Sequence, residues 1–97
     1  MALRVLTDEE VTDALAARGG SEWHLVDGMI TRTVVAPTFV DAIALVDRVA
    51  DLAESANHHP DIDIRYRRVT FALVTHDAGG ITQADLDLAA AIDEAAG

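Results

Sequence analysis

Cysteine is absent from this chain of 97 residues, and lysine is absent as well. Without cysteine the protein has no disulfide, no thiolate metal site and no cysteine nucleophile. The four histidines therefore become the most informative side chains, because imidazole both gives and takes a proton near neutral pH.

Positive charge is also scarce, since the seven basic residues, all arginines, face 17 acidic residues and leave a net charge of −10. A field of this sign repels nucleic-acid phosphates and anionic membrane surfaces, so we expect neither as a direct partner. No apolar run is long enough to span a bilayer, and the first residues contain no long apolar segment. We therefore expect a cytoplasmic protein.

Aromatic side chains are few, and they number four: Trp23, Phe39, Tyr66 and Phe71. Apolar residues make up 51% of the chain, but 18 of them are alanines, so Val, Leu and Ile must build most of the core. A chain of this length forms one domain, residues 1–97, with a modest core. Such a core often gains stability from burying further surface in an oligomer.

Capping and turn signals divide the chain into seven elements. Thr7 and Thr82 each precede an acid by three residues, which is the spacing of a capping box, and Asp27-Gly28 is typical of a hairpin turn. The expected order is a helix at 8–18 stopped by Gly19-Gly20, strands at 23–26 and 29–35, a long helix after Thr38 that ends at 57–60, strands at 63–66 and 69–76, and a helix opened by residues 82–85. Short turns make the strands antiparallel. The class is therefore α+β, in the order α-β-β-α-β-β-α, with a four-stranded antiparallel sheet and helices packed on one face.

The long second helix has an apolar stripe at helical spacing, formed by Phe39, Ala42, Ile43, Val46, Val49, Ala50 and Ala53. Leu45 and Leu52 lie off this stripe, seven residues apart. They are either two scattered exposed leucines or a helix–helix contact of an oligomer. The arginines at 65, 67 and 68 are interpreted as charges that protect an edge strand, in preference to an anion site.

Three histidines fall within one stretch: His58 and His59 lie side by side, and His76 ends a predicted strand. Two histidines in different environments can hold one neutral and one charged imidazole, so that one accepts a proton while the other donates one. Glu54 precedes His58 by four residues, one helical turn, and can orient an imidazole. Asp85 can do the same, although capping of the last helix explains it equally well.

Two other interpretations of the histidines stay open at this point. His58 and His59 can simply favour the dipole at a helix C-terminus, with His76 an ordinary surface residue at a strand end. A metal site is the weaker alternative. Asp61 and Asp63 are close in the sequence, but adjacent histidines in an extended segment project to opposite sides and rarely chelate one ion together.

The spacing of Glu54, His58-His59-Pro60, Tyr66, His76 and Asp85 resembles the signature of the pterin-4a-carbinolamine dehydratases. This pattern has several anchors and is far more specific than a lone histidine pair. The likeness covers most of the chain, with further matches at Trp23, Ile30–Arg32, Phe39 with Ala42, the glycine pair at 79–80, Leu88-Ala89 and Ile92. Val34 and Ala36 stand where animal members carry phenylalanines, a departure that concerns packing and leaves the chemistry unchanged.

The resemblance implies a 4a-hydroxytetrahydrobiopterin dehydratase, a carbon–oxygen lyase of tetrahydropterin regeneration. It implies a pterin substrate, no cofactor, no metal, and dimers or tetramers. It also implies that His58 and His76 are the acid–base pair, that His59 binds substrate, and that Glu54 and Asp85 are supporting carboxylates.

The family also includes members that serve as dimerisation cofactors for a homeodomain transcription factor. The alternative function is therefore a non-catalytic protein-binding module on the same fold. The complete set of histidines and carboxylates favours the dehydratase.

Overall fold

A computed structural model describes residues 3–18 and 21–97 of the chain. The predicted Gly19-Gly20 stop of the first helix lies outside these residues. The elements are α1 (Asp8–Ala17), β1 (His24–Val26), β2 (Met29–Val35), α2 (Phe39–Ala56), β3 (Asp61–Arg65), β4 (Arg68–Leu73) and α3 (Gln83–Ala96). Their order confirms the predicted α-β-β-α-β-β-α arrangement. Within the described part of the chain, no helix is long and apolar enough to cross a membrane.

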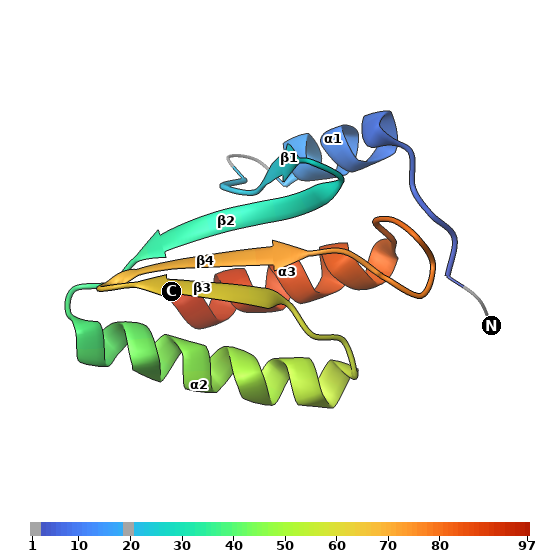
Figure 1. Cartoon of the computed structure of the whole chain (residues 1–97). Coiled ribbons are helices and arrows are strands. Elements are labelled where there is room, and N and C mark those ends of the chain that lie inside the picture. The colour runs from blue at the N-terminus through green and yellow to red at the C-terminus, as the bar shows by residue number, and fades with distance from the viewer. Residues whose placement is uncertain (1–2, 19–20) are drawn as a thin grey trace.

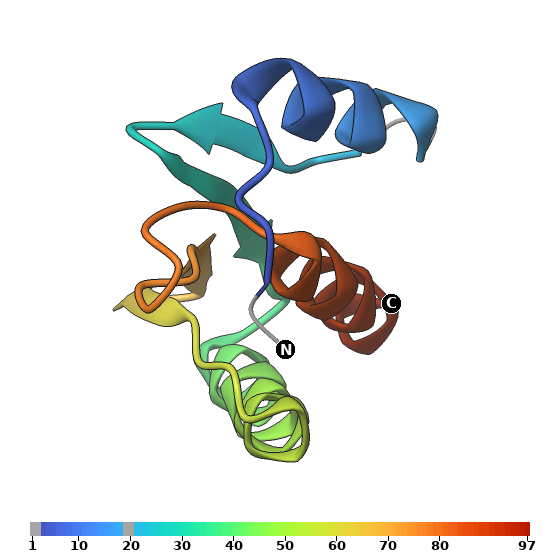
Figure 2. The same cartoon turned by 90° about the vertical axis from the view of Figure 1, so that its right-hand side faces the viewer.

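The four strands form one antiparallel sheet in the order β1-β2-β4-β3, which leaves β1 and β3 at its edges (Figure 1). Figure 2 shows the three helices on one side of the sheet, with α3 between α1 and α2. Side chains of β4 alternate accordingly: Val69, Phe71 and Leu73 are fully buried beneath the helices. On the open face, the hydroxyls of Thr33 and Thr70 lie 2.8 Å apart. These features confirm the α+β class with helices on one face.

The predicted local signals are present at the helix ends. Both capping boxes form, at Thr7 with Glu10 and at Thr82 with Asp85. The bond from Arg4, followed by that from the Thr7 backbone N–H, lowers the pKa of Glu10 to about 2. The hairpin turn between β1 and β2 uses Asp27 and Gly28, both with positive φ.

The second pair of strands is displaced from the predicted bounds. Strand β3 begins at Asp61, and β4 ends at Leu73, so that Thr75 joins the sheet side only through an isolated bridge to Gly80. Tyr66 has a φ of +54° and lies in the turn between the strands, because Arg65 pairs directly with Arg68. The alternation pattern predicted both strands but left residues 67–68 between them, whereas the turn is formed by residues 66–67.

The interpretation of Leu45 as an exposed or intersubunit leucine is wrong. Its side chain is buried in the core of the subunit, and Leu52 packs against the same core. The buried stripe of α2 is Ala42, Leu45, Val49 and Ala53, whereas Phe39 and Ala50 are exposed. Helix α2 contacts α3 as well as the sheet. Its buried face is therefore rotated toward α3, relative to the face that the apolar pattern predicted.

A cluster of charges joins α1, β2 and α3 at the helix-covered side of the sheet. The carboxylate of Asp93 in α3 pairs with the guanidinium groups of Arg18 and Arg32, and the Trp23 indole N–H donates to it at 2.8 Å. Glu22 contacts Arg32 at 2.8 Å. Because Arg32 is mostly buried, Asp93 neutralises a charge that has lost most of its hydration.

We predict that Asp93→Asn lowers the free energy of unfolding by about 2–3 kcal/mol, since it leaves the partly buried Arg18 without a carboxylate and the mostly buried Arg32 with only the exposed Glu22. Urea denaturation measures this change. Asp87→Asn is the matched control, because it makes the same change on the exposed face of α3, where the Gln83 amide is the side-chain partner of Asp87 within residues 3–18 and 21–97. Equal stability of the two variants would show that the cluster contributes nothing.

Candidate active site

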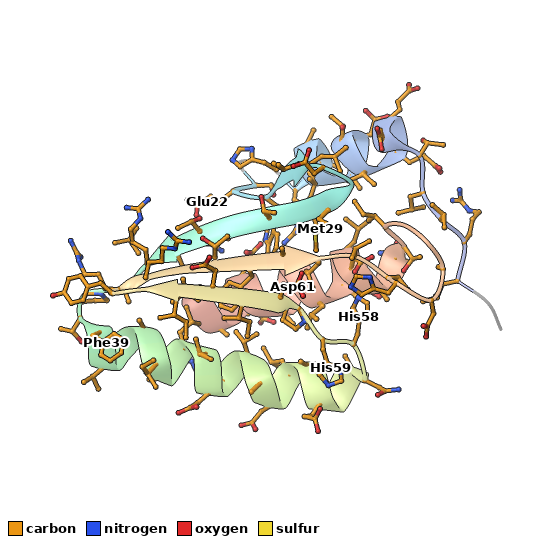
Figure 3. All side chains as sticks on the ribbon, in the orientation of Figure 1. Glu22, Met29, Phe39, His58, His59 and Asp61 are labelled. Atoms are coloured by element: carbon orange, nitrogen blue, oxygen red, sulfur yellow. The ribbon has the colours of Figure 1, made fainter. Side chains whose placement is uncertain are left out.

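Four segments meet at one end of the molecule: the C-terminus of α2, the start of β3, the 74–82 loop and the N-terminus of α3. Helix α2 ends at Ala56, and its C-cap residue Asn57 adopts the left-handed conformation with a φ of +49°. The His58 backbone N–H then bonds the Ala53 carbonyl. The left-handed residue turns the chain out of the helix and toward Pro60, where β3 begins. In Figure 3, His58 lies toward the start of α3 and His59 lies at the end of α2.

His58 is held by a buried carboxylate. Its Nε2 lies 2.5 Å from Oδ1 of Asp85, whose side chain is fully buried, while the imidazole itself is 15% exposed. The imidazole therefore has one nitrogen fixed in the interior and one side open to the surface pocket described below.

Asp85 has two roles that the sequence could not separate. Its Oδ2 accepts the backbone N–H of Thr82 at 2.9 Å, which completes the cap of α3, and also the hydroxyl of Thr75 at 2.8 Å. Its other oxygen binds His58. The helix N-terminus further favours a negative charge at this position. Capping and orientation of an imidazole are thus performed by the two oxygens of the same carboxylate.

Glu54 also contacts an imidazole, but its partner is His59 and not the residue one helical turn ahead. Glu54 Oε2 lies 2.5 Å from His59 Nε2, and both side chains are largely exposed. The predicted neighbour, His58, is displaced because the left-handed Asn57 ends the helix before the i,i+4 relationship is completed. His58 and His59 therefore have separate carboxylates in different environments.

His76 completes the set of histidines. It is exposed in the turn after β4, and it lines a pocket of about 220 Å³ together with Asn57, His58, His59, Thr75 and Asp77. A second hollow of about 360 Å³ adjoins it and shares Asn57, His58, Thr75 and Asp77. The three histidines predicted as functional are thus brought to one pocket, with Asp85 beneath and Glu54 at the side.

This arrangement is suited to proton transfer. One imidazole is oriented by a buried carboxylate, and a second, His76, faces the same pocket without a carboxylate partner among the described residues. A group bound between them can lose a proton to one and gain a proton from the other. Among residues 3–18 and 21–97, no three His, Asp or Glu side chains are grouped closely enough to hold a metal ion.

Two pocket residues were not recognised in the sequence. Thr75 reads as an ordinary strand residue, and Asp77 as a loop acid; only the folded chain brings them beside His58. The arginine cluster lies elsewhere, at the far end of β3, where Arg65 bonds Asp63 and Arg67 bonds the Ala36 carbonyl. Tyr66, an anchor of the sequence pattern, is also at that far end.

Comparison with known proteins gives one consistent family. The family model described as "Pterin 4 alpha carbinolamine dehydratase" matches residues 4–95. A protein of Mycobacterium sp. (strain JLS) named "Putative pterin-4-alpha-carbinolamine dehydratase" is 54% identical over 92 residues, which cover 95% of this chain and 96% of its own. A protein of the same name from Nocardia farcinica is 54% identical over 96 residues and 99% of each chain.

Two solved structures have the same fold as this chain. The chain is similar to the transcriptional coactivator/pterin dehydratase of Brucella melitensis, with a TM-score of 0.89, 33% identity, and coverage of 97% of this chain and 100% of that one. It also shares its fold with a pterin dehydratase-like protein described as a RuBisCO assembly factor of the alpha-carboxysome, with a TM-score of 0.64, 24% identity, and coverage of 77% and 87%.

Proposed function

Because the chain belongs to the pterin-4a-carbinolamine dehydratase family, we propose that it removes water from a 4a-hydroxytetrahydropterin and releases the quinonoid dihydropterin. The observation that carries the proposal is the single pocket lined by His58, His59 and His76, with Asp85 bonded to His58. These side chains supply what the reaction needs, namely one proton donor and one proton acceptor that work near neutral pH.

The chemistry involves two proton movements. The N5–H proton leaves to a general base, the N5 electrons form the N5=C4a bond, and the C4a–O bond breaks. The departing hydroxyl takes a proton from a general acid and leaves as water. No oxidant or reductant takes part, because the product differs from the substrate only by one molecule of water. The two imidazoles end with their protonation states exchanged, and proton exchange with solvent restores them.

In this proposal His58 and His76 are the acid–base pair, and His59 binds the pterin. Asp85 orients His58, and Glu54 orients His59 through its contact at 2.5 Å. The two imidazoles have different surroundings, since His58 is bonded to a buried carboxylate and His76 is exposed.

The fold alone does not select this activity. Relatives with similar folds carry the names coactivator/pterin dehydratase and RuBisCO assembly factor. A protein-binding module on the same fold is therefore the alternative function. It has no need of three histidines at one pocket, of a buried Asp85 bonded to His58, or of Glu54 at His59.

We predict that the protein accelerates dehydration of a 4a-hydroxytetrahydropterin and that His58→Ala and His76→Ala each lower the rate by roughly a hundredfold or less. The reaction also proceeds unaided, which limits the loss. The measurement is the absorbance change on product formation, with His24→Ala as control, because His24 is an exposed histidine of β1. A wild-type rate equal to the spontaneous rate would reject the dehydratase and leave the binding module.

We also propose a homo-oligomer, a dimer or a tetramer, assembled at the β3 edge. All five residues of β3 are exposed, and its outer edge has no partner strand among the described residues. Exposed apolar side chains gather at this strand and at the neighbouring end of α2: Ile62, Ile64, Tyr66, Phe39 and Val40. An exposed edge with apolar side chains readily pairs with another chain.

For this surface, the double substitution Ile62→Glu with Ile64→Glu is expected to lower the mass measured by sedimentation, because it introduces four like charges across a paired interface. Val26→Glu is the control, since Val26 is similarly exposed on β1 at the opposite edge. Circular dichroism checks that the fold is retained. An unchanged mass in a folded double variant would remove β3 from the interface.

A further inference from the structure

The hydrogen bonds around Asp85 all have one direction. Its Oδ2 accepts from the Thr82 backbone N–H and from the Thr75 hydroxyl. A hydroxyl has one proton, so the 2.8 Å contact between the Thr75 and Thr82 hydroxyls is donated by Thr82. Thr75 and Thr82 are both buried, and water does not replace these donors. The bonds from Thr75 and Thr82 thus hold the carboxylate in one orientation independently of His58.

This orientation determines which nitrogen of His58 carries the proton. An ionised carboxylate only accepts, so the 2.5 Å contact between Asp85 Oδ1 and His58 Nε2 requires a proton on Nε2. Nδ1 has no hydrogen-bond partner among the described residues, and it is not among the buried nitrogens left unpaired, which are Arg18 Nη1 and Arg32 Nε. Nδ1 is therefore the nitrogen open to the pocket that His58 lines.

We propose that Nδ1 of His58 is the atom that exchanges a proton with the pterin, and that Thr75 is a positioning residue that acts through Asp85. The inference rests on the proposed function for the identity of the substrate. Thr75 fixes the carboxylate, the carboxylate fixes the Nε2–H tautomer, and the tautomer leaves Nδ1 with its lone pair toward the pocket. The carboxylate also stabilises the imidazolium that forms when Nδ1 takes a proton.

The substitution Asp85→Asn tests this chain of bonds sharply. The Thr82 N–H and the Thr75 hydroxyl both need an acceptor, so the amide oxygen of the new side chain must occupy the Oδ2 position. The amide NH₂ then faces His58 Nε2, which has to accept instead of donate. We expect the proton of His58 to move to Nδ1 and the reactive lone pair to turn away from the pocket.

Long-range ¹H–¹⁵N correlation spectra read the tautomer directly, at a pH where His58 is neutral. In the wild type we expect the proton on Nε2, and in Asp85→Asn on Nδ1. Thr75→Val keeps the shape of the side chain but removes the hydroxyl, and it is expected to give a mixture of tautomers. Thr75→Ser restores the hydroxyl and the wild-type spectrum. Thr70→Val is the matched control, because it removes a threonine hydroxyl that is also hydrogen-bonded, to Thr33, but lies on the open face of β4.

The rates supply a second readout. We expect Asp85→Asn to lower kcat about as much as His58→Ala, by roughly a hundredfold or less. Thr75→Val is expected to lower kcat by about tenfold with KM unchanged, the cost of one hydrogen bond to a charged group, and Thr75→Ser to recover most of it.

A wild-type His58 protonated on Nδ1, an unchanged tautomer in Asp85→Asn, or a Thr75→Val variant that matches Thr70→Val would each overturn the inference. Failure of the proposed function is a separate result: a wild-type protein that does not accelerate dehydration rejects the dehydratase, while the spectra still decide the tautomer.

Discussion

The buried carboxylate of Asp85 is the interaction on which this end of the molecule depends. A charge removed from water is tolerated only where donors replace its hydration, and three donors from three segments do so here. The Thr82 N–H comes from the start of α3, the Thr75 hydroxyl from the loop after β4, and His58 from the connection between α2 and β3. Loss of any one of these hydrogen bonds leaves the buried carboxylate incompletely solvated, so the carboxylate holds the three segments together as a unit.

Helix α3 carries a second such carboxylate near its other end. Asp93 binds Arg18 at the end of α1, Trp23 in the segment before β1 and Arg32 in β2. The apolar surface of α3, with Leu88 and Ile92, provides the burial, but apolar contacts alone allow a helix to slide or rotate. Two carboxylates, facing different neighbours, fix both its position along the sheet and its rotation. The histidine pocket therefore rests on a helix whose placement is determined at two points.

Local structure was largely predictable from the sequence, because its signals act over short distances. The capping boxes at Thr7 and Thr82, the Asp27-Gly28 turn and the strand β2 follow from neighbouring residues alone. The burial of Leu45 did not, because it depends on where α3 lies against α2. The partner of Glu54 was also missed, since one left-handed residue cancels the helical spacing. The resemblance identified the histidines, but the bonds between them and their carboxylates required the fold.

The left-handed Asn57 has a consequence for protein design. The directions in which His58 and His59 leave the backbone both depend on this residue, which tolerates few replacements because most side chains are strained at positive φ. A histidine pair grafted onto the end of an ordinary helix would inherit neither direction. The transferable unit is the whole corner, from the last turn of α2 through Pro60, with an acceptor such as Asp85 supplied by the recipient scaffold.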